Sequence, residues 1–413
     1  MLARTRTAGA VSTLSLVLVL AVMAGPAAAG PTVPITVGTT PGYAIFAEPG
    51  TGSIGTNDPA ILNHLLGLVN GTPCPPPSGG SPEIIRVAIN SISTGALPTQ
   101  IKDKLIEKKN CGVDVRVVVS GSAKGSTAAE SLRTGIGTGA FEWCDHDVTT
   151  KGDGCVSTHT GGGMHTKMML FTNTSFAHCV VWFGSANLTG QTGAESINNG
   201  VTLYNNCTVH NLFRDRIWQP MWDEWEIAGN DFYAPTGRGY LSSSNVTAHA
   251  SPENSSPPTD LVLARLNGMT SGNGCTVGVS QAMWTARGYA NTTGADGEAV
   301  AKRLAALKGG AGCNIGVIVG EKVVNGATVA NIDSGPQAIL TNAGIPIEHG
   351  VVHDKYFFMN GGGKSNTVVT GSHNFSLPAW RQNDEVLVEL SNSQSTYDAY
   401  YQHWFTTLTA TVP

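Results

Sequence analysis

The stretch His165-Thr-Lys-Met-Met-Leu-Phe171 recurs later in the chain as His353-Asp-Lys-Tyr-Phe-Phe358. Gly-Ser-x-Asn follows each copy, with its glycine 19 residues after the first histidine and 18 residues after the second. Residues two apart on a strand project from the same face. Each histidine and its lysine are therefore predicted to point together, as are each serine and its asparagine. The two matched sets of candidate residues are His165, Lys167, Ser185 and Asn187, and His353, Lys355, Ser372 and Asn374.

The sequence around these motifs repeats as well. In each half, a helical stretch, a cysteine and a strand-like run precede a second helical stretch, a second cysteine and a second strand. The expected helices are residues 59–69, 101–109, 261–266 and 299–307, and the expected strands are residues 84–89, 113–119, 276–280 and 315–319. Strands that alternate with helices predict an α/β fold with a mixed, mostly parallel sheet in each half.

The repeat also predicts the domain boundaries. The first half is expected to span residues 30–235 and the second half residues 259–413. The stretch between them, residues 236–258, is rich in proline and serine, so it is predicted to be a linker.

The eight cysteines contain no C-x-x-C pair, and an even count favours disulfides over a metal cluster. Cys74 and Cys111 are 37 residues apart and occupy the same places in the repeat as Cys275 and Cys313, which are 38 apart. Each of these two pairs is predicted to form a disulfide. The other pairings are Cys144–Cys155, on extra chain present only in the first half, and by elimination Cys179–Cys207, expected to link two neighbouring strands.

Residues 1–29 have the features of a secretory signal peptide. Arg4 and Arg6 precede an apolar run over residues 11–25, and Ala27-Ala-Ala29 predicts cleavage before Gly30. The apolar run is shorter than the roughly twenty residues that cross a bilayer, so the protein is expected to be secreted. Loss of the two arginines would change the formal net charge from −5 to −7. An acidic protein does not attract phosphate polymers broadly, which weakens a nuclease hypothesis without excluding it.

The paired motifs resemble those of the phospholipase D superfamily, whose hallmark is His-x-Lys followed by Gly-Ser-x-Asn, usually twice in one chain. The resemblance covers essentially the whole chain after the signal peptide. It implies two tandem α/β halves related by a pseudo-twofold axis, with one active site at their interface and no cofactor or metal.

The same residue types also suit phosphodiester chemistry on physical grounds. A phosphodiester is an anion that repels nucleophiles, so Lys167 and Lys355 can first neutralise its charge, helped by the two asparagine amides. A neutral imidazole, with an ordinary pKa near 6.5, can then attack phosphorus. The other imidazole, when protonated, can give its proton to the departing alcohol.

The resemblance also implies a role for each histidine, with His165 as the nucleophile and His353 as the general acid. Glu385 stands 14 residues after Gly371, where the family has a carboxylate that orients a catalytic histidine. The equivalent count in the first half reaches Asn198. Glu385 is therefore expected to accompany His353 and to keep it protonated.

For the substrate, export and acidity favour a phospholipid, cleaved to phosphatidic acid and a free headgroup alcohol during transient contact with a membrane surface. The alternatives are a secreted nuclease of the same superfamily, which would bind nucleic acid, and a non-catalytic binding protein. We expect a monomer. A zinc site is a further alternative, with candidate ligands His146, His159, His165, His349 and His353.

Two groups of aromatic residues could belong to the core or to the substrate site. Trp218, Trp222 and Trp225, and the stretch 397–404, are predicted to lie on repeated core helices. The candidates for the edge of the site are Met283, Trp284, Arg287, Tyr289, Trp380 and Arg381, while His373 is expected to point away from it.

Overall fold

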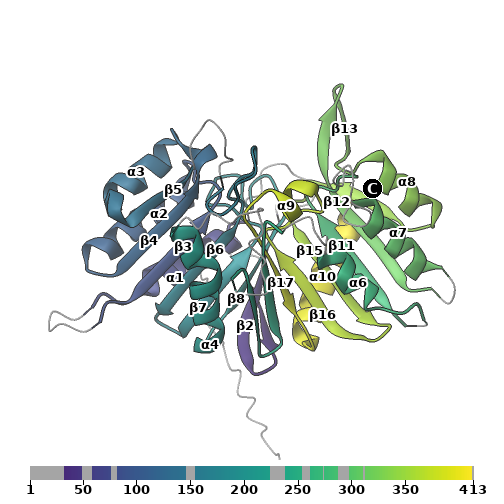
Figure 1. The fold of residues 1–413 in the computed structure, drawn as a ribbon, viewed down its shortest axis with the longest axis horizontal. Coiled ribbons are helices and arrows are strands. Elements are labelled where there is room, and N and C mark those ends of the chain that lie inside the picture. Colours follow the sequence, from purple (N-terminus) through teal and green to yellow (C-terminus); the bar gives the residue numbers. More distant parts are fainter. Residues whose placement is uncertain are drawn as a thin grey trace, which may run out of the picture.

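The computed structural model describes residues 32–48, 58–75, 81–145, 154–223, 238–253, 261–272, 274–286, 297–309 and 312–411. Two α/β halves lie side by side, each with one mixed sheet and with helices on its outer face (Figure 1). The predicted signal peptide lies outside the described residues, as do His146, Trp225, Arg287 and Tyr289. Within the described part, no helix combines the length and the apolarity needed to cross a membrane.

The first half contains an eight-stranded sheet in the order β1-β2-β8-β7-β6-β3-β4-β5. Its strands are β1 (Thr32–Val37), β2 (Thr40–Ala47), β3 (Ile84–Ile89), β4 (Asp114–Ser120), β5 (Phe141–Cys144), β6 (Lys167–Asn173), β7 (His178–Gly184) and β8 (Asn198–Leu203). Its α-helices are α1 (Ala60–Gly71), α2 (Ala96–Asn110), α3 (Thr127–Ile136), α4 (Cys207–Phe213) and α5 (Gln219–Trp222), with a π-helical turn over Arg214–Trp218 and 3₁₀ turns at Gly121–Ala123 and Thr138–Ala140.

The second half contains a nine-stranded sheet in the order β13-β12-β11-β15-β16-β17-β10-β9, with β14 paired to β12. Its strands are β9 (Tyr240–Ser243), β10 (Val246–Ser251), β11 (Thr276–Gln281), β12 (Asn314–Val324), β13 (Ala327–Ala330), β14 (Ile347–Gly350), β15 (Lys355–Gly361), β16 (Lys364–Gly371) and β17 (Glu385–Leu390). Its helices are α6 (Leu261–Asn267), α7 (Gly297–Lys308), α8 (Ser334–Asn342), α9 (Leu377–Arg381) and α10 (Gln394–Thr411).

The predicted α/β fold and mixed sheets are confirmed, but the expectation of mostly parallel strands is wrong. In each sheet only two strand pairs are parallel: β3–β4 and β4–β5 in the first, and β11–β12 and β12–β14 in the second. Helical crossovers allow parallel pairing, whereas short turns join only antiparallel strands. The motif-bearing strands β6 and β15 continue through short turns into β7 and β16, so these pairs are antiparallel.

The stretch predicted to be a linker contributes two strands to the second sheet. β9 and β10 pair with each other, and β10 also pairs with β17 along its whole length. Val246, Ala248 and Ala250 alternate along β10 and are buried in the central core. This alternation is a strand pattern, which the sequence prediction overlooked because prolines and serines surround it.

The structure has one apolar core within each half and a third core shared between the halves. One lies between the first sheet and α1–α3, and another lies between the second sheet and α6–α8. The third is shared by the inner faces of both sheets, α4, the π-helical turn and α10. Trp218 and Trp404 occupy equivalent places in it, because their indole nitrogens donate to the carbonyls of Val87 on β3 and Val279 on β11. Both tryptophans are thus repeated core residues, as predicted.

All four predicted disulfides are present: Cys74–Cys111, Cys144–Cys155, Cys179–Cys207 and Cys275–Cys313. Each lies within one half, and in the chain-entropy model each contributes on the order of 3 kcal/mol. One detail differs from the prediction, because Cys179–Cys207 joins β7 to the start of α4 rather than to a strand. Four disulfides are typical of proteins in oxidising compartments.

Candidate active site

The glycines of the two Gly-Ser-x-Asn motifs allow a close approach between neighbouring strands. A Cβ on Gly184 would lie 2.4 Å from the carbonyl oxygen of Asn199, and one on Gly371 would lie 2.1 Å from that of Val386. Both separations are shorter than any real contact of a Cβ. The motifs therefore require glycine at the ends of β7 and β16, where the chain lies directly beside the start of β8 or β17.

Each catalytic candidate histidine is held by the backbone of the opposite half. The His165 amide donates to the Asp384 carbonyl at 2.9 Å, and the His353 amide donates to the Ile197 carbonyl at 2.8 Å. Isolated bridges join Met164 to Asp384 and Ile197 to Val352. The start of the last strand of each half thus lies against the histidine motif of the other half, and the site is built at the junction.

This crossing exchanges the partners of the two histidines. His165 Nδ1 lies 2.8 and 2.9 Å from the two carboxylate oxygens of Glu385, and His353 Nδ1 lies 2.9 Å from the Asn198 side-chain oxygen. The expectation that Glu385 accompanies His353 is therefore wrong. Counting along one half finds the right residues but assigns them to the wrong histidine, because each faces across the junction.

The serines of the two motifs donate hydrogen bonds to Glu385 and Asn198, the partners of the two histidines. Ser372 is fully buried and donates to Glu385 at 2.5 Å, and Ser185 is fully buried and donates to the Asn198 side-chain oxygen at 3.2 Å. Each serine hydroxyl also accepts a bond from the backbone of the adjoining strand. This geometry favours a positioning role for the serines over contact with substrate.

The two lysines lie beside the histidines of their own motifs, as predicted. Lys167 Nζ donates to the His165 carbonyl at 2.6 Å, and Lys355 Nζ donates to the His353 carbonyl at 2.9 Å. Lys355 Nζ also lies 3.1 Å from His353 Nε2. Both lysines are almost completely buried, whereas the His165 side chain is 21% exposed. The imidazoles are therefore more accessible to a substrate than the ammonium groups.

Burial and neighbouring charges shift the pKa values of the histidines, the lysines and Glu385. Burial lowers the pKa of Lys167 to about 7 and holds that of Lys355 well below its usual range, with Lys167 adding to the second effect. Burial and the two lysines also hold the pKa of His353 well below 6.5. Burial lowers the pKa of His165, against the opposing charge of Glu385. Burial alone would raise the pKa of Glu385, but His165 and Lys167 outweigh it and lower that pKa to about 2.

A bound phosphodiester would reverse most of these shifts, because its negative charge favours the protonated forms of the bases. We expect dimethyl phosphate, whose own charge is constant near neutral pH, to bind with uptake of protons and less tightly as pH rises above about 7. Calorimetry in buffers of different ionisation enthalpy measures this uptake. Lys167→Met should reduce it, and binding without proton exchange would contradict the expectation.

The two motif asparagines are placed alike. The side-chain oxygens of Asn187 and Asn374 are both buried and have no hydrogen-bond partner among the described residues. Asn187 also lines a small cavity of about 70 Å³ together with His353 and Asn198. The structure therefore brings Asn187 of the first half close to His353 of the second half.

Asp384, directly before Glu385, fastens the disulfide-bonded loop of the first half onto the second half. Its buried carboxylate accepts hydrogen bonds from the backbone amides of Cys155, Val156 and Ser157. The loop then continues to His165. Sequence reasoning missed this residue, although its place next to a candidate carboxylate was a usable signal.

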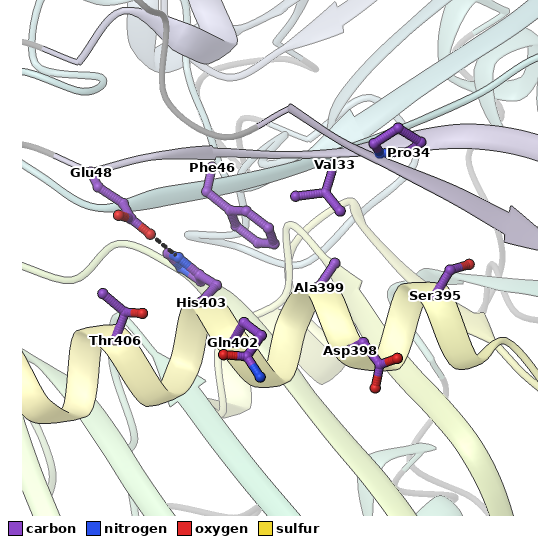
Figure 2. A pocket seen from close by; sticks show the side chains of 10 residues that line it. All are labelled: Val33, Pro34, Phe46, Glu48, Ser395, Asp398, Ala399, Gln402, His403 and Thr406. Atoms are coloured by element: carbon purple, nitrogen blue, oxygen red, sulfur yellow. Dashed lines mark hydrogen bonds and ion pairs between the residues drawn. The ribbon is translucent and has the colours of Figure 1, made fainter. Parts of the chain in front are cut away.

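A second missed group lies behind the His353 motif. Asp354 is fully buried and accepts from His403 Nε2 at 2.9 Å, while His403 Nδ1 lies 2.5 Å from Glu48. Figure 2 shows Glu48 and Phe46 of the first half facing His403 on α10, and the Phe46 and His403 rings stack with centroids 4.0 Å apart. These residues border a cavity of about 450 Å³ that none of the catalytic candidates lines. The group thus ties both halves to the residue between His353 and Lys355.

This buried group should make stability depend on pH. Burial alone would lower the pKa of His403, but Asp354 and Glu48 raise it to about 9. A raised pKa contributes stability that is complete below about pH 6.5 and is lost as pH rises through about 9, on the order of 3 kcal/mol in all. Between about pH 7 and pH 10, the free energy of unfolding in urea should fall more for the wild type than for His403→Gln. Equal losses would contradict the assignment, and His349→Gln, which changes a partly exposed histidine, serves as control.

The zinc alternative and the peripheral candidates add no residues to the site. No group of three or more His, Cys, Asp or Glu side chains within the described ranges could hold a metal ion. Trp284, Trp380 and Arg381 are at most 2% exposed, so they belong to the core rather than to the edge of the site. His373 is also buried, with its ring centroid 5.8 Å from that of Trp380.

A family model described as "Cardiolipin synthase, PLD-like domain" matches residues 82–221 and 284–408, together more than half of the chain. The chain belongs to the phospholipase D superfamily. Members of this superfamily act on phosphodiester bonds, and both matched segments contain one complete His-x-Lys and Gly-Ser-x-Asn set. A search of curated proteins gives no significant match.

Several solved structures align with this chain at low sequence identity. Phosphatidylserine synthase from Haemophilus influenzae Rd KW20 aligns with a TM-score of 0.52 and 10% identity, over 91% of this chain and 88% of that one. Yeast tyrosyl-DNA phosphodiesterase aligns with a TM-score of 0.45 and 12% identity, over 84% and 89%. Polyphosphate kinase from Porphyromonas gingivalis aligns with a TM-score of 0.47 and 13% identity. This alignment covers 84% of this chain but only 47% of the kinase.

Proposed function

We propose that this superfamily member is a secreted phospholipase D, which hydrolyses phospholipids to phosphatidic acid and a free headgroup alcohol. The observation that carries the proposal is the convergence of two imidazoles and two buried lysines at the junction of the halves. Such a cluster attracts the anionic phosphodiester and supplies both a nucleophile and a proton donor.

In the first step, His165 Nε2 attacks phosphorus. Glu385 faces Nδ1, so it holds the Nδ1 proton and leaves the Nε2 lone pair directed at the site. A nitrogen–phosphorus bond forms and the bond from phosphorus to the alcohol oxygen breaks. The alcohol leaves with a proton from His353 Nε2, and the lysines balance the charge that develops on the phosphoryl oxygens.

In the second step, water takes the place of the alcohol. His353, now neutral, removes a proton from water as the oxygen attacks phosphorus, and the bond to His165 breaks. The products are a phosphomonoester and the alcohol, and both histidines return to their starting states. The overall change is the addition of one water to one phosphodiester.

Charge and the comparisons with known proteins favour a lipid over a nucleic acid as the substrate. The chain has a formal net charge of −5 and so lacks the overall positive charge of most nucleic-acid enzymes. The names of the family model and of the phosphatidylserine synthase both refer to enzymes of phospholipids. Secretion is supported by the predicted signal peptide and by the four disulfides.

The deciding experiment offers the purified protein mixed phosphatidylcholine and phosphatidylglycerol vesicles and, in parallel, plasmid DNA. We expect phosphatidic acid from the vesicles and intact plasmid, with no product from the His165→Ala variant. Nicked or degraded plasmid without phosphatidic acid would favour the nuclease alternative.

We also expect the activity to survive exhaustive chelation. Two imidazoles and two ammonium groups supply the nucleophile, the acid and the charge stabilisation that a metal would otherwise provide. Phosphatidic acid release should therefore change less than about twofold in excess EDTA. Activity that disappears with EDTA and returns with added zinc or calcium would contradict this expectation.

A further inference from the structure

The cavity beside His353 is small and uniformly polar. It measures about 70 Å³, which is room for about five water-sized groups. Besides His353 and the two asparagines already described, its lining comes from the segment between β7 and β8: Thr189, Gln191, Thr192 and Ser196. None of the described residues that line it, apart from His353, has an ionisable or aromatic side chain.

The hydrogen bonds around this cavity suit a hydroxyl group. Thr192 Oγ1 already donates to the Asn187 carbonyl at 2.7 Å, so toward the cavity it offers an acceptor. Ser196 Oγ accepts from the Asn198 amide at 3.0 Å, so its own proton is not used in that bond. A hydroxyl group both donates and accepts hydrogen bonds, so it can donate to Thr192 Oγ1 and accept from Ser196 Oγ at the same time.

Other leaving groups fit the cavity less well. A quaternary ammonium group is recognised by aromatic faces or carboxylates, and it neither donates nor accepts a hydrogen bond. A nucleoside exceeds the volume and would need a surface on which its base can stack. The chemistry of the lining therefore selects against choline, and both its size and its chemistry select against a nucleoside.

We propose that this cavity binds the departing alcohol and selects a small, uncharged group that carries hydroxyls, such as glycerol. The inference rests on the proposed function, in which His353 gives its proton to the leaving oxygen and so must lie beside that alcohol. Phosphatidylglycerol is then the better substrate, and phosphatidylcholine the poorer one.

The test compares kcat/KM for phosphatidylglycerol and phosphatidylcholine in mixed micelles. We expect the wild type to prefer phosphatidylglycerol by about tenfold or more. Gln191→Glu places a carboxylate at the exposed edge of the cavity and should reduce this preference by about fivefold or more. Thr192→Val removes the acceptor and should lower kcat/KM for phosphatidylglycerol alone. Gln402→Glu, the same change at an exposed glutamine away from the cavity, should alter neither value.

Binding without turnover separates this inference from the proposed function. Calorimetry should show tighter binding of glycerophosphoglycerol than of glycerophosphocholine, with the difference reduced in Gln191→Glu. Equal binding, tighter binding of the choline diester, or a preference that Gln191→Glu leaves unchanged would overturn the inference, even if the protein hydrolyses phospholipids. Conversely, failure to hydrolyse bis(4-nitrophenyl) phosphate would refute the proposed function, whereas the binding preference would still support or refute the cavity's selectivity.

Discussion

Replacing His353 by alanine is expected to separate the two chemical steps when the substrate is bis(4-nitrophenyl) phosphate. Nitrophenolate is stable as an anion and needs little help from an acid, so His165 can still attack and release it once. Regeneration of the free enzyme should then fail, because the variant has no His353 to remove a proton from the attacking water. The expected result is a burst of about one nitrophenolate per enzyme, followed by turnover lowered by about 10³-fold.

His165→Ala should behave differently, because it removes the proposed nucleophile. We expect no burst, and a loss of about 10⁴-fold or more with both the nitrophenyl diester and phospholipid. With phospholipid, His353→Ala should also be nearly inactive, since an alkoxide leaves poorly without a proton. His349→Ala changes a histidine outside the site, paired with Glu321, and should retain full activity. A burst in His165→Ala but not in His353→Ala would reverse the two roles.

The sequence was enough to predict two halves and all four disulfides, and it named candidate residues that the structure brings together at the junction. The two halves and the pairs Cys74–Cys111 and Cys275–Cys313 follow from a repeat in which matching residues, such as Lys167 and Lys355, occupy the same places in two copies. The other two disulfides were assigned from the extra chain of the first half and by elimination. The repeat alone could not show how the copies face each other. That arrangement depends on the central core, where α10 of the second half packs against β1 and β2 of the first.

The crossed partners are the main consequence that sequence reasoning could not reach. Glu385 is close to Ser372 in sequence and also in space, so assigning it to its own half was natural. The backbone contact between Asp384 and His165 shows that β17 begins beside the other half. The His403 group was missed for the same reason, since its members lie 49 and 355 residues apart.

The asymmetry between Glu385 and Asn198 predicts unequal effects of changing them. Glu385→Gln preserves size but removes the charge that stabilises His165 as an imidazolium, and its amide can present a donor to Nδ1 and select the wrong tautomer. Loss of the equivalent charge in a serine-protease triad costs about 10⁴ in kcat, so we expect a fall of about 10³ to 10⁴ here. The pH dependence of kcat measures this fall, and mass spectrometry shows which histidine carries the phosphoryl adduct.

Asn198→Asp should reduce activity less than Glu385→Gln does, and at high pH it should increase activity. A carboxylate beside His353 raises a pKa that burial and the lysines hold low. His353 must carry a proton to act as the acid, so activity should extend to higher pH. The change has a structural cost, because the Asn198 amide donates to the Ser196 carbonyl at 2.8 Å and an aspartate cannot. We expect about 1–3 kcal/mol less stability, with the phosphoryl adduct still on His165.

Combining Glu385→Gln with Asn198→Asp exchanges the partners of the two histidines. The substrate bis(4-nitrophenyl) phosphate has two identical leaving groups, so it can bind with either one toward either histidine. If the carboxylate partner determines which imidazole attacks, the double variant should recover a burst that Glu385→Gln lacks, with the adduct on His353. A double variant no more active than Glu385→Gln, although folded by its melting curve, would mean that features other than the partner assign the nucleophile. The two halves carry matched lysines, serines and asparagines but differ at this pair, because Glu385 faces His165 Nδ1 with a charge and Asn198 faces His353 Nδ1 without one. For that reason we expect the exchange to move the covalent adduct from His165 to His353.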